Sequence, residues 1–374
     1  MPRRLLITLG FPPATGGMQR YLYERCLAST DPIMVLAPDL EGAEAFDAKQ
    51  PFDIYRWNGF LRDALLIKRV FQVVFPLYSA FAIYRRRGFD LIECGQALPF
   101  GLIALFFQWL FGVPYIVWVH GNDVLKPQRY PLLRQLLSLI LRKAKAIVAN
   151  SKTIGQTVVK LGVDAEKVVV VNPSVDAKRF HPQIDSTEIV TRYGLQGKKV
   201  ILTVGRLVER KGMDTVIKSM PKIMESIPNV VYLIVGEGNY RSELERLVKE
   251  LGLNGKVIFA GRVAEEDLPK FYNACDLFVM VSRTLEDKGE IEGFGIAYLE
   301  AGACGKPVIG GKTGGISDAI EDGVTGLLVD PLDTEEVTDS IVKLLKDEAL
   351  AKELGRNGRK RAIREPGWAL LTHI

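Results

Sequence analysis

The feature that most constrains this chain is the alternation of short, apolar, β-branched runs with helical patterns. Six such runs precede the polar stretch 176–197, and six follow it. The expected strands are Leu5–Leu9, Ile33–Ala37, Leu91–Glu93, Tyr115–Val119, Ala146–Ala149, Val168–Val171, Val200–Val204, Val230–Val235, Val257–Ala260, Leu277–Val281, Pro307–Ile309 and Gly326–Val329. Strands that alternate with helices indicate parallel sheets covered on both faces. The sequence therefore predicts an α/β fold of two doubly wound domains, residues 1–180 and 181–374, with a ligand cleft between them.

Length and composition agree with two globular domains and exclude several other classes of protein. The 374 residues are 48% apolar and 25% charged, which is too apolar for a disordered chain and sufficient for a large core. The four cysteines form no C-x-x-C pair, and the three histidines lie far apart in sequence. A disulfide scaffold and a Cys or His metal site are therefore not expected. We expect a reduced, cytoplasmic protein with no metal and no nucleic-acid partner.

The net charge of +5 is divided unevenly between the two halves. Residues 1–180 contain 23 basic and 14 acidic residues, a charge of +9, whereas residues 181–374 contain 26 and 30, a charge of −4. A basic half is typical of a domain that meets an anionic surface or substrate, and an ordinary solvated surface explains it equally well. Charge alone leaves both interpretations open.

Two apolar segments could be mistaken for targeting or membrane segments. Leu5–Leu9 follows a charged start, but it is too short for a signal peptide and a glycine loop at Gly16-Gly17 follows it. The 18 residues Leu102–Val119 carry no charge, yet Gly112-Val113-Pro114 divides them. We expect a buried helix over Leu102–Phe111 and then a buried strand, so no membrane-spanning helix.

A basic loop follows the first strand expected in the second half. Gly205 and Arg206 come directly after Val200–Val204, and Lys211 lies five residues beyond Arg206. At the carboxyl end of a strand both side chains can reach one phosphate group, the arginine through paired hydrogen bonds and the lysine as a point charge. In isolation, a solvated basic turn is the more common explanation of such a loop.

The segment Glu292–Glu300 combines two glutamates with a glycine turn. Gly293 and Gly295 allow the backbone to approach a ligand, and the helix expected after them presents free amides to an anion or a sugar hydroxyl. Glu292 lies before this helix and Glu300 about one turn inside it, so both carboxylates are expected to face the ligand from different heights. A helix cap beside an exposed glutamate is the plain structural alternative.

In the first half, two glycine-containing turns follow expected strands. Gly16-Gly17 comes after Leu5–Leu9, and His120-Gly121-Asn122-Asp123 comes directly after Tyr115–Val119. A histidine and an aspartate at the carboxyl end of a strand lie where doubly wound domains bind their ligands. A histidine bonded only within its own loop is nevertheless the more common case.

Together and in this order, the motifs resemble the retaining glycosyltransferase family 4, whose GT-B fold has two Rossmann-like domains facing each other across a cleft. The resemblance covers nearly the whole chain and is closest to mannosyltransferases that act on lipid acceptors. The matching segments are G-R-L-x-x-x-K-G from Gly205, E-G-F-G-I-x-x-x-E from Glu292, A-C-G-x-P-V-I from Ala303, T-G-G from Thr313, Gly16-Gly17, His120–Asp123, Asn150-Ser151 and Asn172–Asp176.

The resemblance implies how the second half binds the donor. Arg206 and Lys211 are similar to the pair that neutralises the donor diphosphate as it leaves. Glu300 is similar to the residue that holds the donor ribose hydroxyls, and Arg262 lies where the family places its base-binding loop.

The resemblance also implies residues around the transferred sugar. The expected clamp on that sugar consists of Glu292 and the amides of Phe294, Gly295 and Ile296. From the first domain, the loop at Gly16 and Gly17 is expected to approach the diphosphate and the acceptor. His120 is similar to the residue beside the reacting sugar carbon, and Asp123 is expected to orient His120 or the acceptor.

The residue types agree with sugar transfer that needs no metal. Departure of the diphosphate leaves negative charge on the phosphate, which the arginine, the lysine and the helix terminus would stabilise. The sequence contains no D-x-D motif, so the divalent-metal site of the other common glycosyltransferase fold has no obvious ligands. The resemblance implies retention of anomeric configuration, and no clear carboxylate nucleophile is present, so we expect front-face attack, with the leaving phosphate helping to deprotonate the acceptor. No cofactor is expected beyond the nucleotide-sugar co-substrate.

The resemblance favours GDP-mannose as the donor and a lipid-linked or envelope-glycan acceptor. A UDP-sugar transferred to a soluble acceptor is the alternative. An epimerase of similar architecture, a phosphorylase and a non-catalytic binding module are also considered. The epimerase would not need the second glutamate motif, the phosphorylase would carry pyridoxal phosphate, and the binding module would release no nucleotide.

A basic helical pattern in the first half suggests where a lipid acceptor is reached. Apolar residues recur at helical spacing through Phe60–Phe75, with Lys68 and Arg69 among them, and Arg85-Arg86-Arg87 follows. Such a helix can lie on an anionic membrane, which would make the enzyme peripheral on the inner face of the cell membrane. A core-facing helix with solvated arginines explains the pattern at least as well.

Two segments depart from the family pattern. After Trp368 the sequence runs only to Ile374, whereas relatives usually continue into a helix that crosses back to the first domain, so we expect this strap to be missing or truncated. The loop Ser282–Ile291 is longer and more charged than a minimal connection. It is expected either to shape the sugar pocket or to lie on the surface.

Overall fold

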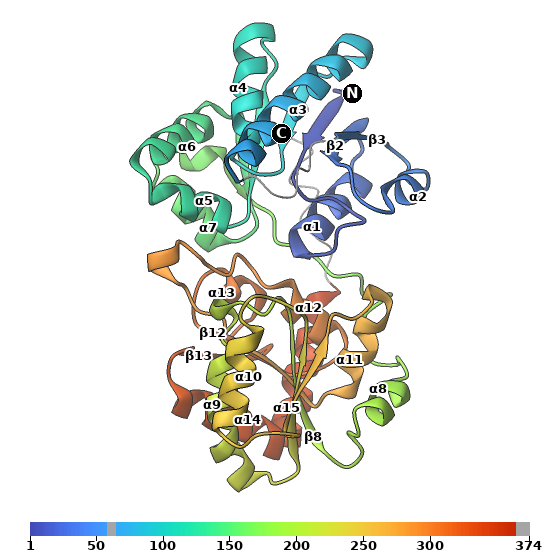
Figure 1. Ribbon diagram of the computed structural model, residues 1–374, viewed down its shortest axis with the longest axis vertical. Helices are drawn as coiled ribbons and strands as arrows, with labels where there is room; N and C mark the ends of the chain where they lie inside the picture. The colour runs from blue at the N-terminus through green and yellow to red at the C-terminus, as the bar shows by residue number, and fades with distance from the viewer. Residues whose placement is uncertain (58–64, 364–374) are drawn as a thin grey trace. The chain divides into compact units, whose positions relative to one another are not determined.

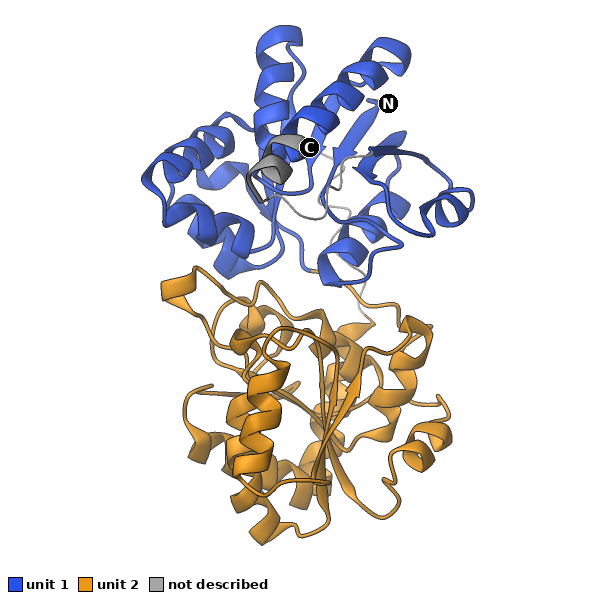
Figure 2. Ribbon diagram, in the orientation of Figure 1, with its two compact units in different colours: residues 1–172, 366–374 blue, residues 173–365 orange. Residues whose placement is uncertain are grey.

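Two parallel sheets, one in each half of the chain, organise the structure, a computed structural model that describes residues 1–57 and 65–363. The described residues divide into two units, 1–172 and 173–363, which Figure 2 colours separately; Figure 1 gives the element labels. The chain changes unit at Asn172 and Pro173, shortly before the boundary expected at 180. Each unit has the doubly wound α/β architecture that the sequence predicts.

The described part of unit 1 contains seven parallel strands in the order β3-β2-β1-β4-β5-β6-β7. The strands are β1 (Arg4–Ile7), β2 (Ile33–Pro38), β3 (Asp53–Trp57), β4 (Leu91–Cys94), β5 (Tyr115–Val119), β6 (Ala146–Ala149) and β7 (Val168–Val170). All but β3 match a predicted strand. The sequence prediction missed β3 because it is an edge strand whose first residue is exposed and whose next three are half-buried, so it lacks a continuous apolar run.

Helices cover both faces of this sheet. Tyr21 and Leu22 of α1 (Gly17–Leu27) pack with Leu6 and Trp118 on one face. On the other, the Tyr115 hydroxyl donates to the Ile140 carbonyl in helix α6 (Pro131–Lys143) at 2.6 Å. The helices on this second face are α3 (Leu65–Arg87), α4 (Phe100–Phe111), α6 (Pro131–Lys143) and α7 (Lys152–Val159). The short helices α2 (Ala43–Asp47) and α5 (Asn122–Gln128) complete the labelled set of this unit.

A buried charge cluster fixes the centre of the unit 1 sheet. Glu93 of β4 is fully buried and accepts hydrogen bonds from Arg4 at 3.2 Å and from Arg25 at 2.9 Å. The indole of Trp118 donates to its second oxygen at 3.0 Å. These three donors satisfy the buried carboxylate and tie β1, α1 and β5 to β4.

Helix α4 corrects one expectation. The sequence predicts a buried helix over Leu102–Phe111, and the helix forms over Phe100–Phe111, but only one side of it is buried. Phe106, Trp109 and Leu110 are exposed, Trp109 to 82%. Apolar composition predicted burial on all sides because it carries no information about which faces find a partner. Among the described helices, none combines the length and the apolar character needed to cross a membrane.

The described part of unit 2 contains six parallel strands in the order β10-β9-β8-β11-β12-β13. They are β8 (Lys199–Val204), β9 (Val230–Val235), β10 (Val257–Gly261), β11 (Leu277–Met280), β12 (Val308–Gly311) and β13 (Leu327–Val329), and all match predicted strands. The strand order reverses direction between β8 and β11. Ligands of doubly wound sheets bind at such a switch point, outside the carboxyl ends of the strands.

Two apolar layers enclose the unit 2 sheet. Helices α9 (Met213–Ser226), α10 (Arg241–Glu250) and α14 (Thr334–Lys346) pack on one face. Helices α8 (Thr187–Arg192), α11 (Leu268–Ala274), α12 (Ile296–Ala303) and α13 (Ile316–Ala319) pack on the other, where α15 (Glu348–Ala362) contacts α12. The four cysteines are free and buried.

Two predictions concern residues outside the described ranges. Residues 60–64 of the basic pattern at Phe60–Phe75 lie outside them, as does the C-terminal segment 364–374 in which a strap was expected to be missing.

Candidate active site

The loops that follow β8, β11 and β12 carry the site residues of unit 2. Because the three strands are parallel neighbours, their carboxyl ends lie at one edge of the sheet. Arg206 and Lys211 follow β8, the loop ending in Glu292 follows β11, and Gly314 follows β12. The fold therefore brings three of the predicted motifs to one place.

Glu292 lies at the centre of a buried cluster of charges. Its Oε2 atom accepts from the Lys211 Nζ at 2.7 Å and from the Arg210 guanidinium at 2.5 Å. The hydroxyl of Ser282 lies 3.5 Å from the same oxygen. All three charged side chains are about nine-tenths buried. Two cations on one carboxylate oxygen leave the cluster with a net positive charge.

The pKa values in this cluster reflect a competition between burial and charge. Burial alone would raise the pKa of Glu292, but the charges of Lys211 and Arg210 outweigh it and hold that pKa at about 2. Burial lowers the pKa of Lys211, and the charges of Arg210 and Arg206 lower it further, against the opposing effect of Glu292. Glu292 is therefore ionised at any physiological pH, and Lys211 gives up its proton more readily than an exposed lysine.

The glycine pair after β12 fixes the backbone of Glu292. The amide of Gly315 donates to the Glu292 carbonyl at 3.0 Å. Gly314 has a φ of +60°, and a Cβ atom there would lie 2.5 Å from the same carbonyl oxygen. The T-G-G motif is thus explained by close packing of two loops, because any larger residue at 314 would displace Glu292.

Arg206 and Arg262 lie at the same sheet edge, with exposed side chains. Arg206 follows β8 and is close enough to lower the pKa of Lys211, but Glu292 pairs with Lys211 and Arg210. Arg262 follows β10, the edge strand next to β9. The structure therefore brings Arg206 near Lys211, and places Arg262 directly after the outer strand β10.

Glu300 is held separately from Glu292. It lies in the second turn of α12 and is nine-tenths buried, and its Oε2 accepts from the Tyr272 hydroxyl of α11 at 2.6 Å. The helix begins at Ile296 after Gly295, whose φ is +92°. The amides of Phe294, Gly295 and Ile296 therefore occur at a helix N-terminus, where partial positive charge favours an anion or a hydroxyl oxygen.

The charged loop Ser282–Ile291 is anchored to the body of unit 2. The guanidinium of Arg283 is buried and bonds Asp214 at 3.0 Å, and Thr284 bonds Thr313 at 2.6 Å. Lys288 forms an ion pair with Glu209. These contacts hold the segment that leads into Glu292.

In unit 1, the turn after β5 is organised around Asp123. One Asp123 oxygen accepts from the amides of His120 and Gly121, each at 2.9 Å. The His120 Nε2 lies 2.9 Å from the carbonyl oxygen of Gly95, and since a carbonyl can only accept, Nε2 carries the proton. The turn thus fixes the ring of His120 from both its backbone and its side chain.

Two buried oxygen atoms near this turn have no hydrogen-bond partner among the described residues. They are the second oxygen of Asp123 and the amide oxygen of Asn150, whose Nδ2 faces the His120 carbonyl at 3.4 Å. Gly16 and Gly17 are exposed at the N-terminus of α1. Unpaired buried acceptors are costly, so this end of unit 1 is suited to ligand hydroxyls.

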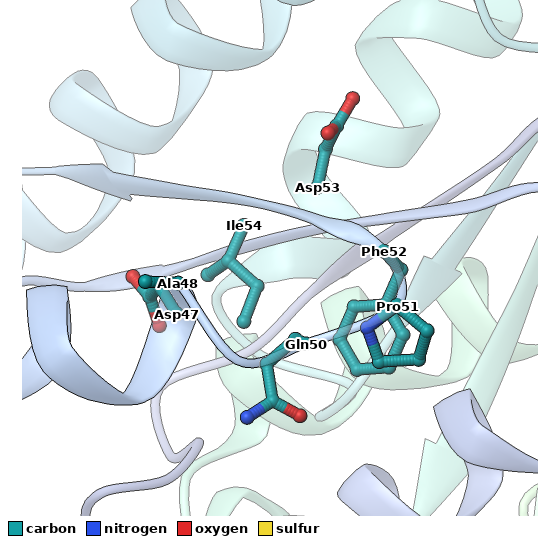
Figure 3. A pocket seen from close by; sticks show the side chains of 7 residues that line it. All are labelled: Asp47, Ala48, Gln50, Pro51, Phe52, Asp53 and Ile54. Carbon is teal, nitrogen blue, oxygen red and sulfur yellow. The ribbon is translucent and has the colours of Figure 1, made fainter.

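The hollow in Figure 3 contains none of the predicted residues. It has a volume of about 330 Å³ and lies beside the amino end of β3, lined by Asp47, Ala48, Gln50, Pro51, Phe52, Asp53 and Ile54. Asp47 is engaged by Arg56 at 2.6 Å, and Gln50 accepts from Tyr23 at 2.9 Å. We assign no function to it.

No group of three or more His, Cys, Asp or Glu side chains in the described residues is arranged to hold a metal ion.

Sequence reasoning missed two contributors to the site. The sequence motifs assign no role to Arg210, although it shares the Glu292 oxygen with Lys211. Tyr272 carries no motif, yet its hydroxyl positions Glu300. Arg210 is adjacent to Lys211 in the R-K-G segment before α9, and this position was the one sequence feature that indicated it. No sequence feature indicated Tyr272.

Comparisons with known families agree with these motifs. Residues 15–179 match the model of Glycosyltransferase Family 4, and residues 185–361 match the model of Glycosyl transferases group 1. The division between the two matches lies close to the change of unit after Asn172.

Relatives are similar along their whole length. The chain is 30% identical, over 97% of its own length and 94% of the relative's, to a GDP-mannose-dependent alpha-(1-6)-phosphatidylinositol monomannoside mannosyltransferase of Mycolicibacterium smegmatis. It is 32% identical, over 99% and 95%, to the corresponding enzyme for the monoacylated monomannoside in Corynebacterium glutamicum.

Solved structures share the fold. The Anabaena protein HepE in complex with UDP-glucose superposes with a TM-score of 0.81 at 21% identity, covering 97% of this chain and 94% of that one. Sucrose-phosphate synthase from Thermosynechococcus elongatus gives a TM-score of 0.81 at 24% identity, with the same coverage. Motifs, fold and full-length similarity together show that the chain belongs to glycosyltransferase family 4, has the GT-B fold, and is a nucleotide-sugar-dependent hexosyltransferase.

Proposed function

We propose that this enzyme transfers mannose from GDP-mannose to a lipid-linked acceptor, with retention of configuration and without a divalent metal. The observation that carries the choice of sugar and acceptor is the full-length similarity to two GDP-mannose-dependent mannosyltransferases named for phosphatidylinositol monomannosides. The cationic cluster around Glu292 supports the absence of a metal from the mechanism, because fixed guanidinium and ammonium groups can neutralise a diphosphate themselves.

The donor diphosphate binds next to Arg206 and Lys211. The Lys211 ammonium is already placed by its bond to Glu292, and the Arg206 side chain is exposed at the same loop. A diphosphate beside Lys211 raises the pKa of that lysine and so keeps it charged. Arg210 keeps Glu292 ionised and in place when the lysine turns towards the phosphate.

Glu300 and Glu292 bind the two uncharged parts of the donor, the ribose and the transferred sugar. Glu300, positioned by the Tyr272 hydroxyl, accepts from the ribose hydroxyls. Glu292 accepts from hydroxyls of the sugar, beside the amides that begin α12. Carboxylates that are already held by neighbouring hydrogen-bond donors lose little conformational freedom when the ligand binds. This favours a well-aligned nucleotide sugar.

Transfer then breaks the bond between the anomeric carbon and the diphosphate oxygen. The electron pair of that bond goes to the phosphate, where Arg206, Lys211 and the N-terminus of α12 stabilise the added charge. The acceptor hydroxyl attacks the same face of the sugar, and its proton passes to a phosphate oxygen. His120, the Asp123 turn and the Gly16-Gly17 loop contribute from unit 1.

The proposed acceptor places the enzyme at a membrane. Unit 1 is the basic half of the chain, and Arg85, Arg86 and Arg87 at the end of α3 are exposed. We propose a cytoplasmic enzyme that works as a peripheral protein on the inner face of the cell membrane, where an anionic surface attracts this half.

A UDP-sugar is the second candidate donor. The observation that favours it is the shared fold with HepE, whose structure contains UDP-glucose. That similarity is limited to 21% identity, whereas the mannosyltransferases match at 30% or more. GDP-mannose is therefore preferred.

A two-step experiment tests the proposal. A thermal-shift screen of GDP, UDP, GDP-mannose and UDP-glucose identifies the donor, because a ligand that binds only the folded state raises the melting temperature. Labelled donor is then incubated with a phosphatidylinositol monomannoside and, separately, with soluble sugars. We expect stabilisation by GDP and GDP-mannose, and label in the lipid product with the anomeric configuration of the donor. Stabilisation by UDP alone, or label only in soluble sugars, would favour the second candidate.

A further inference from the structure

The surface formed by α3 and α4 is unusual for a protein in water. On α3, Val74, Tyr78 and Phe81 follow one another at helical spacing and are all exposed, Tyr78 to 73%. On α4, the exposed residues are Phe106, Trp109 and Leu110. Contiguous apolar surface of this kind normally marks a binding face, whereas scattered single side chains do not.

The two sets of side chains belong to neighbouring helices. The ring of Phe81 lies 6.2 Å from that of Phe111, and the ring of Tyr84 lies 4.7 Å from the same ring. Figure 1 shows α3 and α4 as adjacent helices on one side of unit 1. We call the six exposed side chains Val74, Tyr78, Phe81, Phe106, Trp109 and Leu110 the aromatic face.

The helices that form and flank the aromatic face carry no acidic residue. Helix α4 contains no charged residue, and neither α3 nor α6 contains an acidic one. Arg85, Arg86 and Arg87 are exposed at the end of α3, and Arg142 and Lys143 are exposed at the end of α6. Gln108 of α4 donates to the carbonyl of Lys143 at 3.4 Å, which ties the second cation group to α4.

This combination points to one occupant. We propose that the aromatic face docks on an anionic lipid bilayer, with the rings of Trp109 and Tyr78 at headgroup depth and the flanking arginines on lipid phosphates. Tryptophan and tyrosine favour the membrane interface because they have an apolar body and a polar tip. Surrounding cations add attraction to anionic headgroups. A second copy of the chain on this face would bring two sets of arginines together, which disfavours a dimer.

The inference rests on the proposed lipid acceptor for its biological purpose, but it can be measured without any transfer reaction. The aromatic face is formed by described side chains, and only Val74 among them belongs to the basic pattern at Phe60–Phe75. Docking through it would keep unit 1 on the surface that holds the acceptor and replace diffusion in three dimensions by diffusion in two.

Tryptophan fluorescence offers a direct readout. Trp57 and Trp118 are buried, whereas Trp109 is 82% exposed. Substituting Trp368→Phe removes the tryptophan that lies outside the described residues. In that background we expect vesicles of equal parts phosphatidylglycerol and phosphatidylcholine to shift emission to the blue and brominated lipids to quench it. Pure phosphatidylcholine should produce a much smaller change.

Variants separate the proposal from its competitors. Trp109→Gln with Tyr78→Gln should weaken co-sedimentation with the mixed vesicles by about tenfold or more. Arg85→Gln with Arg86→Gln should weaken it several-fold and remove most of its salt dependence. The matched control is Leu332→Gln, an exposed apolar residue of unit 2, which should change nothing.

Three results would overturn the proposal. They are no vesicle binding by the parent, binding that the Trp109 and Tyr78 changes leave intact, and concentration-dependent dimers that those changes abolish. Each variant is first checked for an unchanged melting temperature and an unchanged shift with the preferred nucleoside diphosphate. Failure of transfer to lipid with intact vesicle binding would count against the proposed acceptor and not against the docking surface.

Discussion

The polar groups assigned to the donor in unit 2 and those assigned to the acceptor in unit 1 differ in how they are paired. In unit 2, Lys211 and Arg210 both pair with one carboxylate oxygen of Glu292, whose pKa is held at about 2. In unit 1, the turn at His120 leaves one oxygen of Asp123 and one of Asn150 without a partner among the described residues. The unit 2 groups are charged and paired with one another before any ligand arrives, whereas the unit 1 turn keeps unpaired hydrogen-bond acceptors.

This difference follows from what each unit binds. A diphosphate carries its own charge, and groups that meet it must already be charged and fixed, because reorganising buried charges is expensive. An acceptor hydroxyl is neutral and needs only an open hydrogen-bond acceptor. Changes in the unit 2 cluster should therefore affect the chemical step, and changes in the unit 1 turn should affect acceptor binding.

The largest effect is expected for Lys211→Ala. Loss of a fixed charge at the leaving group should lower kcat by about 10² to 10³-fold. The protein should stay folded, because Glu292 retains its bond to Arg210 at 2.5 Å. Steady-state kinetics and a melting curve check both parts. Lys222→Ala, at a half-exposed lysine paired with Glu335, is the matched control. Full activity of Lys211→Ala would contradict the assigned role.

A smaller effect is expected for Arg210→Met, which acts through Glu292. With one cation removed, the pKa of Glu292 should rise from about 2 towards its ordinary value of 4.5, and kcat should fall by about tenfold. In the parent, the depressed pKa contributes stability that is complete above pH 4.5 and is lost as the pH falls towards 2. The variant should lose part of this acid-range dependence.

Unfolding by urea between pH 2.5 and 6 measures that dependence. Arg210→Lys serves as the control, because a second ammonium should restore most of it. An identical pH dependence of stability in the parent and in Arg210→Met would mean that Arg210 does not set the ionisation of Glu292.

Tyr272→Phe should sharpen the distinction between binding and chemistry within unit 2. It removes one hydrogen bond to the Glu300 carboxylate, which is worth about 1.5–3 kcal/mol when the acceptor is charged. We expect KM for the donor to rise about tenfold with kcat nearly unchanged, since Glu300 is assigned to the ribose. Tyr193→Phe, a tyrosine packed on Phe271 of the same helix, is the control. A fall in kcat without a change in KM would place Glu300 in the chemical step.

The smallest effect is expected in unit 1, for Asp123→Asn. The asparagine oxygen can still accept from the amides of His120 and Gly121, so the turn should keep its shape. The second oxygen becomes an NH₂ group, and KM for the acceptor should rise a few-fold while KM for the donor stays constant. Initial rates with each substrate varied in turn give KM for the acceptor and KM for the donor separately. A change confined to KM for the donor would contradict the assignment of acceptor binding to unit 1.

Most of the fold could be predicted because buried parallel strands are continuous apolar runs. The strand β3 was missed for the same reason, since Asp53 and Arg56 interrupt its apolar pattern at the sheet edge. The exposed side of α4 was also missed, because the composition of a helix does not show which of its faces remain unpartnered. Prediction worked where burial is symmetric and failed where it is one-sided.

The candidate site was predictable only where a motif names the residue. Lys211 and Glu292 are both in motifs, and the structure places them 2.7 Å apart. Arg210 and Tyr272 act through contacts across 82 and 28 residues of chain, so local sequence gives no spacing that would connect them to Glu292 and Glu300. Positioning residues of this kind become visible only when the side chains are seen together.

The most direct test of charge neutralisation by fixed side chains is the initial rate of transfer in the presence of a chelator. Purified enzyme is treated with EDTA, and the release of nucleoside diphosphate is followed with and without added Mg²⁺ or Mn²⁺. If Arg206 and Lys211 neutralise the departing diphosphate, the rate stays unchanged in all three conditions. A rate that disappears with EDTA and returns with either ion would contradict that role.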